Sequence, residues 1–143
     1  MEGAQVLVLD ASVAVKWYVI EDQRDKALKL RQDYMDGKID LVTPSLILYE
    51  VGNAIRYHPG AMGSDVEEAI KGLREMEIAI QDLTDAVIKV AANIAFIEDV
   101  TFHDATYLAI AESLNTKLIT ADEKLYEQIK ERRGRILLLK NYQ

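Results

Sequence analysis

The sequence predicts an α/β fold, a three-layer α/β/α sandwich built on a five-stranded, mostly parallel sheet. Short apolar runs alternate along the chain with longer segments whose apolar residues recur at helical spacing. The first run, residues 6–9, has no polar break, which is typical of a strand buried on both faces. Such strands belong to parallel sheets that helices cover on both sides.

Five segments have the pattern of strands. The predicted strands are Gln5–Leu9, 41–43, 78–83, Lys117–Thr120 and 136–139. Each is separated from the next by at least one segment with helical periodicity, as parallel neighbours in a sheet require. We therefore expect crossover helices between consecutive strands.

Seven segments have the pattern of helices, and most carry a start or stop signal. Trp17, in the first, is expected in the core, and the third carries Ile47, Val51 and Ile55 on its buried face. The predicted helices are 11–19; 23–36, ended by Gly37; one after Pro44; one capped by Ser64 with Glu67; one from the Thr84 cap to residue 97; 102–115, capped by Thr101; and 123–133, ended by Gly134.

Length and composition limit the class of protein. The 143 residues suit a single domain, 1–143, and the absence of cysteine excludes disulfides and thiolate metal sites. With no secretory-type start and no apolar stretch of about 18 residues, we expect no membrane partner and a cytoplasmic location. The net charge of −7 argues against a protein that binds nucleic acid through phosphate contacts alone. Bound cations can still let an acidic protein act on nucleic acid.

Two aspartates follow predicted strands directly. Asp10 comes after residues 6–9, and Asp122 follows the strand Lys117–Thr120. Ligands of open α/β sheets bind just beyond the carboxyl ends of the strands, so both side chains are placed for function. Each could instead be the N-cap of the helix that follows, and the sequence leaves this alternative open.

Two further acids lie on predicted helices. Asp104 could complete the cap made by Thr101, yet it heads an apolar stripe that should face the sheet. Glu50 is the only charge in its apolar stretch, and Asn53 shares its helix face. A glutamate in such a segment is seldom buried without a partner, and residues 41–55 contain no lysine or arginine. A metal ion is therefore a natural partner.

Together the four acids predict a metal site. Crowded carboxylates raise one another's pKa values, so a site that keeps them ionised at neutral pH needs cations. Oxygen ligands without histidine or cysteine favour Mg2+ or Mn2+ over Zn2+. Such ions activate water and stabilise the leaving oxygen in phosphodiester cleavage. The predicted set is Asp10, Glu50, Asp104 and Asp122.

Four motifs in order resemble one known family. The sequence reads VLDAS at 8–12, PSL at 44–46 with EVGN at 50–53, FHDATYLA at 102–109, and ITAD at 119–122. This pattern resembles the PIN domains, and among them the toxin ribonucleases of VapBC toxin–antitoxin pairs. Each motif is weak alone, but four in the right order over nearly the whole chain are fairly specific.

The resemblance implies a function and a set of residues. It implies a ribonuclease dependent on Mg2+ or Mn2+, with metal and catalytic carboxylates at Asp10, Glu50, Asp104 and Asp122. Ser12, Asn53 and Thr120 match the small polar residues near the metal. It also implies an RNA substrate, a homodimer, and a cognate antitoxin whose arginine enters the acidic site.

Three other functions share part of this pattern. A haloacid-dehalogenase-type phosphatase would need a second aspartate where Ser12 stands, and a receiver domain would need an acidic pair near its first strand. A non-enzymatic metal- or protein-binding module with a PIN-like fold is the remaining alternative. The intact set of acids argues against it.

Overall fold

A computed structural model describes residues 4–143, and within them the sheet has five strands, all parallel. The strand order is β3-β2-β1-β4-β5, which confirms the predicted α/β sandwich. The strands are β1 (Gln5–Leu9), β2 (Ile39–Pro44), β3 (Ala79–Gln81), β4 (Lys117–Thr120) and β5 (Ile136–Leu138).

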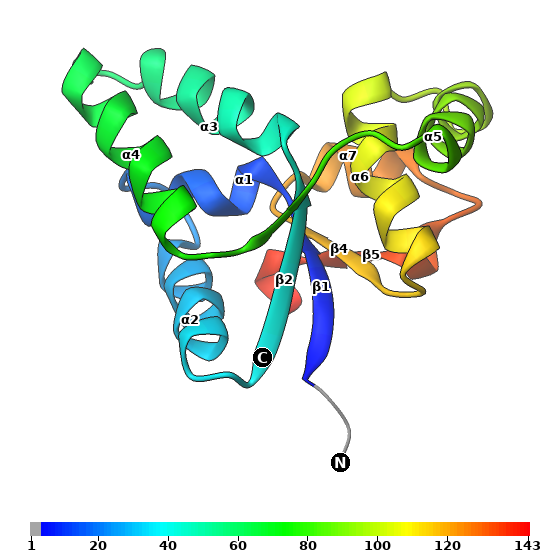
Figure 1. The fold of residues 1–143 in the computed structure, drawn as a ribbon, viewed down its shortest axis with the longest axis horizontal. Coiled ribbons are helices and arrows are strands. Elements are labelled where there is room, and N and C mark those ends of the chain that lie inside the picture. Colours follow the sequence, from blue (N-terminus) through cyan, green and yellow to red (C-terminus); the bar gives the residue numbers. More distant parts are fainter. Residues whose placement is uncertain (1–3) are drawn as a thin grey trace.

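Helices cover both faces of the sheet. In Figure 1, α1 to α4 lie on one side of the strands and α5 to α7 on the other. The helices are α1 (Ala11–Ala14), α2 (Arg24–Met35), α3 (Leu46–Arg56), α4 (Gly63–Glu75), α5 (Asp85–Ile97), α6 (Phe102–Ser113) and α7 (Glu123–Gln128), with short 3-10 turns at Val15–Trp17, Arg133–Arg135 and Leu139–Asn141. None of the helices described in residues 4–143 is long and apolar enough to span a bilayer.

The core has two halves because side chains alternate along the strands. Leu7 and Leu9 of β1 join the cluster beneath α1 to α4, whereas Val8 joins the cluster beneath α5 to α7. All three are buried. Trp17 is buried as predicted, and its indole Nε1 donates to the Ala27 carbonyl at 2.8 Å. The uninterrupted apolar run at 6–9 is thus explained by burial on both faces.

The order of the strands fixes where a ligand can bind. The chain runs from β1 outward to β2 and β3, then returns to the other side of β1 for β4 and β5. The crossovers therefore change direction between β1 and β4, and ligands of open α/β sheets bind at the carboxyl ends of the strands at such a point. Asp10 follows β1 directly, and its backbone N–H donates to the Ile119 carbonyl of β4 at 3.1 Å.

Two predicted helices end five residues earlier than expected. The first is helical only from Ala11 to Ala14 and then tightens into the 3-10 turn Val15–Trp17. The last ends at Gln128 and not at residue 133. Its end is set from elsewhere in the fold, because Glu98 Oε1 accepts hydrogen bonds from the backbone N–H groups of Lys130 and Glu131. Those N–H groups are then not available to continue a helix.

One predicted helix cap is wrong and two are confirmed. The N-cap of α4 is Met62, not Ser64, and Asp65 Oδ2 accepts from the Met62 N–H at 2.7 Å. The hydroxyls of Thr84 and Thr101 cap α5 and α6 as predicted. Strand β2 is longer than expected and β3 shorter. The strand that places α3 therefore extends through Pro44 to the edge of the sheet.

Candidate active site

Asp10 is a buried carboxylate with no positively charged partner among residues 4–143. Its side chain makes no capping hydrogen bond to α1, so the alternative that it is merely an N-cap is wrong. Instead Oδ2 accepts from Ser12 Oγ at 2.5 Å and from Thr120 Oγ1 at 2.7 Å. Burial raises the pKa of Asp10 from 3.8 to about 6, although both hydroxyls oppose the shift. The ionised form is therefore costly in the isolated chain.

A hydroxyl network joins the ends of β1 and β4 around Asp10. Ser12 Oγ and Thr120 Oγ1 lie 3.2 Å apart, and Thr120 is fully buried. Ser12 Oγ accepts from the Ala121 N–H at 2.9 Å, and Thr120 Oγ1 accepts from the Asp122 N–H at 3.1 Å. The network fixes the Asp10 carboxylate and the start of the Asp122 segment relative to each other.

Glu50 is held in place by Tyr107, a residue that the sequence patterns did not single out for function. Tyr107 Oη of α6 donates to Glu50 Oε1 of α3 at 2.6 Å. Tyr107 is fully buried, and burial, followed by the negative charge of Asp10, raises the pKa of its hydroxyl far above the usual range. The hydroxyl therefore stays a hydrogen-bond donor at every working pH.

Asp104 and Asp122 complete the acidic edge. Burial raises the pKa of the half-buried Asp104, and the charges of Asp122 and Glu50 raise it further. Asp104 and Glu50 likewise raise the pKa of Asp10. Exposed Asp122 does cap its helix, since Oδ1 accepts from the Leu125 N–H at 2.9 Å. The structure thus brings the four predicted carboxylates into one electrostatically coupled region.

The chemistry of this region fits a hard divalent cation. None of the four carboxylates belongs to an ion pair found in residues 4–143. The donors are oxygens, which suit Mg2+ or Mn2+. Across the same residues, no three histidine or acidic side chains converge closely enough to form a complete cation site. Mg2+ usually keeps several waters and takes only one or two carboxylates directly, so this spacing is compatible with it.

The comparison with known proteins identifies the family. Residues 7–131 match the PIN domain family. The chain is a PIN domain. The match covers the strand ends that carry Asp10 and Asp122 and the helices that carry Glu50 and Asp104.

Two curated relatives of this PIN domain come from Pyrobaculum aerophilum. Ribonuclease VapC3 is 31% identical over 127 residues, covering 85% of this chain and 93% of that protein. Exonuclease VapC9 is 28% identical over 123 residues, covering 86% of this chain and 85% of that protein. A toxin–antitoxin complex from Klebsiella pneumoniae contains a chain with the same fold, at a TM-score of 0.69 and 13% identity, covering 93% of this chain and 97% of that one.

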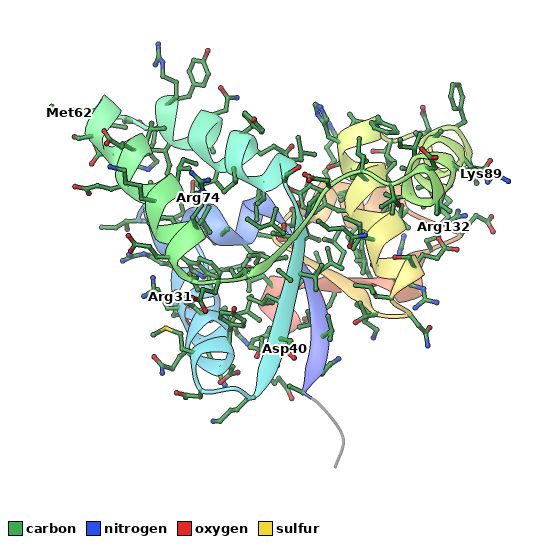
Figure 2. All side chains as sticks on the ribbon, in the orientation of Figure 1. Arg31, Asp40, Met62, Arg74, Lys89 and Arg132 are labelled. Carbon is green, nitrogen blue, oxygen red and sulfur yellow. The ribbon has the colours of Figure 1, made fainter. Side chains whose placement is uncertain are left out.

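Asn53 lies apart from the network around Asp10. It is exposed on α3 and lines a groove between α3 and α4 together with Gly52, Ile70 and Arg74. Arg74 of α4 is labelled in Figure 2. The role implied for Asn53 by family resemblance therefore remains a prediction.

Tyr107 belongs to the site although its place in the sequence suggested only packing. It sits three residues after Asp104 in a helix whose neighbouring side chains are almost all buried. A tyrosine hydroxyl in a fully buried stripe needs a hydrogen-bond partner, which is the one signal that could have marked it. Its partner, Glu50, lies 57 residues earlier in the chain.

Proposed function

We propose that this PIN domain is a metal-dependent ribonuclease, the toxin of a toxin–antitoxin pair. The observation that carries the proposal is the group of four coupled carboxylates at the carboxyl edge of the sheet. Asp10 and Asp122 follow β1 and β4, Glu50 and Asp104 lie on α3 and α6, and none is paired with a cation in the described chain. The names of the two curated relatives, a ribonuclease and an exonuclease, support RNA or another nucleic acid as substrate.

Mg2+ is the proposed cofactor, and Mn2+ is a second candidate. Asp10, Glu50, Asp104 and Asp122 would hold the cation, one or two of them directly and the others through its bound waters. When bound, it supplies an activated water and stabilises the charge that develops on the phosphodiester. Ser12 and Thr120 orient Asp10 by their hydrogen bonds, and Asn53 is proposed to orient substrate.

Tyr107 has a positioning role in this proposal. Its hydroxyl holds one oxygen of Glu50, so the other oxygen is directed by a rigid, buried partner. Groups that orient metal-binding side chains typically contribute about 10- to 100-fold to activity or metal affinity. They do so without touching the substrate.

The decisive experiment is cleavage of single-stranded RNA with a matched pair of variants. Wild type should cleave in Mg2+ or Mn2+ and stop in EDTA, and Asp10→Asn should remove the activity. Asp33→Asn is the control, because Asp33 is as buried as Asp10 but lies in a separate network with Tyr142 and Lys29. Activity that survives both EDTA and Asp10→Asn would come from a contaminating nuclease. Metal binding without cleavage would favour the non-enzymatic module.

A cognate antitoxin is the proposed protein partner. The Klebsiella neighbour is described as a toxin–antitoxin complex, which supports this assignment. An arginine of the antitoxin can occupy the acidic site, since a guanidinium pairs bidentately with carboxylates and keeps its charge. The antitoxin tail is proposed to pack along helix α3 beyond Glu50.

The partner is tested by co-purification with the product of the adjacent gene. The complex should block RNA cleavage, and alanine in place of the tail arginines should restore it. Unchanged inhibition by the altered tail would show that the antitoxin acts elsewhere.

The remaining assignments are part of the same proposal. We assign residues 1–143 to one domain, a cytoplasmic location because RNA and the antitoxin are there, and a homodimer in solution. Light scattering during size-exclusion chromatography gives the mass directly, and a protomer mass at micromolar concentration would exclude the dimer.

A further inference from the structure

A cavity of about 330 Å³ opens beside the acidic edge of the sheet. Its floor comes from the ends of two strands, through Ser45 after β2 and Gln81 of β3. Its walls come from Tyr49 of α3 and from Phe102 and His103 of α6. It therefore lies at the same carboxyl edge as the four carboxylates.

The cavity shares its walls with the candidate active site. Tyr49 precedes Glu50 on α3, and His103 precedes Asp104 on α6. The hydrogen bond from Tyr107 to Glu50 ties these two helices together. A molecule that contacts Tyr49 and His103 is therefore one residue away, on each helix, from a predicted metal ligand.

The lining has the chemistry of a site for a flat, neutral ring. Tyr49, Leu83 and Phe102 are 77%, 51% and 41% exposed, so large apolar faces remain open to an incoming group. Ser45, Gln81 and His103 add hydrogen-bonding atoms to this apolar lining. Among the described residues that line the cavity there is no lysine or arginine, and Glu50 and Asp104 are adjacent in sequence to its walls. This charge pattern disfavours a phosphate and favours an uncharged occupant.

We propose that this cavity binds one nucleobase of single-stranded RNA, next to the phosphodiester held at the carboxylates. The inference rests on the proposed ribonuclease function. Unstacked bases are commonly held on aromatic side chains and recognised through the hydrogen bonds of their edges. Tyr49 and Phe102 supply the stacking surfaces, and Gln81 and Ser45 lie where they can contact the edge of the base. The cavity is then a specificity-determining site.

The test combines protein variants with altered substrates. Tyr49→Ala and Phe102→Ala should each raise KM for a short single-stranded RNA roughly 5- to 150-fold, with a smaller change in kcat. Tyr49→Phe keeps the ring and should restore the wild-type KM. Tyr57→Ala is the matched control, because Tyr57 lies just after α3 and is 72% exposed but is not part of the cavity.

Abasic nucleotides then identify the base that occupies the cavity. One abasic position beside the cleaved bond should raise KM for wild type at least as much as Tyr49→Ala does. On that abasic RNA, Tyr49→Ala should raise KM little further, because its contact with the base is already lost. If the KM changes from Tyr49→Ala and from the abasic nucleotide add fully at every position of the RNA, the proposal is overturned.

The outcomes separate this inference from the proposed function. If wild type shows no metal-dependent cleavage, the proposed function fails, and this inference fails with it. If wild type cleaves but Tyr49→Ala and Phe102→Ala leave KM unchanged, only the base site is wrong. If Tyr49→Ala lowers the mass in solution and its activity loss disappears at high protein concentration, the cavity is instead an interface between two copies of the chain.

Discussion

Asp10 and Asp33 are the same residue type with the same 7% exposure, yet their pKa values shift in opposite directions. Asp33 accepts from Tyr142 Oη at 2.5 Å and from Lys29 Nζ at 3.0 Å. The Tyr142 bond, followed by that of Lys29, lowers the pKa of Asp33. Asp10 receives only neutral hydroxyls, and burial raises its pKa to about 6.

The difference separates a structural carboxylate, Asp33, from the carboxylate that we propose binds a cation, Asp10. Lys29 neutralises Asp33 and Tyr142 anchors it, so its charge stabilises the fold by tying α2 to the C-terminal 3-10 turn. The charge of Asp10 lacks a compensating cation in the described chain, and two further acids raise its pKa. A buried charge without a partner is costly, so a bound cation should stabilise the region around Asp10.

The largest expected effect is stabilisation by metal. At a free Mg2+ or Mn2+ concentration of 100 times Kd, the unfolding free energy of wild type should rise by about 2.7 kcal/mol. Metal should raise the unfolding free energy of an Asp10→Asn, Asp104→Asn double variant much less. It should raise that of Asp33→Asn as much as that of wild type. Thermal melts with and without EDTA measure this. If millimolar metal leaves the Tm of wild type unchanged, the proposed metal site is contradicted.

Next in size is the loss of stability in Asp33→Asn. The change removes a charged acceptor from Tyr142 and Lys29, so the unfolding free energy at neutral pH should fall by about 2 kcal/mol. Because the folded pKa of Asp33 lies below 3.8, this contribution is present above 3.8 and is lost as the pH falls through the folded value. Urea unfolding of both proteins should therefore converge at low pH. A constant difference would mean that the charge of Asp33 contributes nothing.

In EDTA, Asp10→Asn should raise the unfolding free energy, whereas Asp33→Asn lowers it. Removing the unpaired charge should raise the unfolding free energy by roughly 1–2 kcal/mol above pH 6, since asparagine still accepts hydrogen bonds from Ser12 and Thr120. The folded pKa of Asp10 is raised, so the cost of its charge is full above about 6 and disappears as the pH falls towards 3.8. The advantage of the variant should disappear over the same range. A variant that is less stable than wild type at every pH would contradict this reading of Asp10.

The smallest expected effect comes from Ser12→Ala in EDTA. Losing the Ser12 hydrogen bond should raise the pKa of Asp10 beyond about 6, because this bond lowers it in wild type. The unfolding free energy at neutral pH should fall by about 1 kcal/mol. NMR titration of the aspartate carboxyl carbons measures the pKa, with Asp33 as an internal control that should not move. If the pKa of Asp10 is unchanged in Ser12→Ala, Thr120 alone orients the Asp10 carboxylate.

Local patterns were sufficient to predict the sheet and the acids. An apolar run followed by an aspartate marks the end of β1, and a similar pattern marks the end of β4. Glu50 stood out because its neighbours are apolar. These features are local in sequence, and parallel topology then brings the strand ends together.

Features that depend on distant partners could not be predicted in the same way. The end of α7 is set by Glu98, which is 32 residues before Lys130. The role of Tyr107 depends on Glu50 in another helix. Whether Asp10 caps its helix could not be decided from sequence, because only the positions of Ser12 and Thr120 show that its oxygens are engaged elsewhere.

The hydrogen bond from Thr120 to Asp10 joins residues 110 positions apart, so the acidic edge cannot be complete before the ribosome has added Thr120 and Asp122. At about 5–20 residues per second, the ribosome needs roughly 5–20 seconds after adding Asp10 to reach Thr120 and Asp122. During that time the growing chain carries Asp10 and then Glu50 and Asp104, but not the end of β4 that orients Asp10. The proposed nuclease would therefore become active only near the end of its own translation. The proposed antitoxin could then bind the site as it forms.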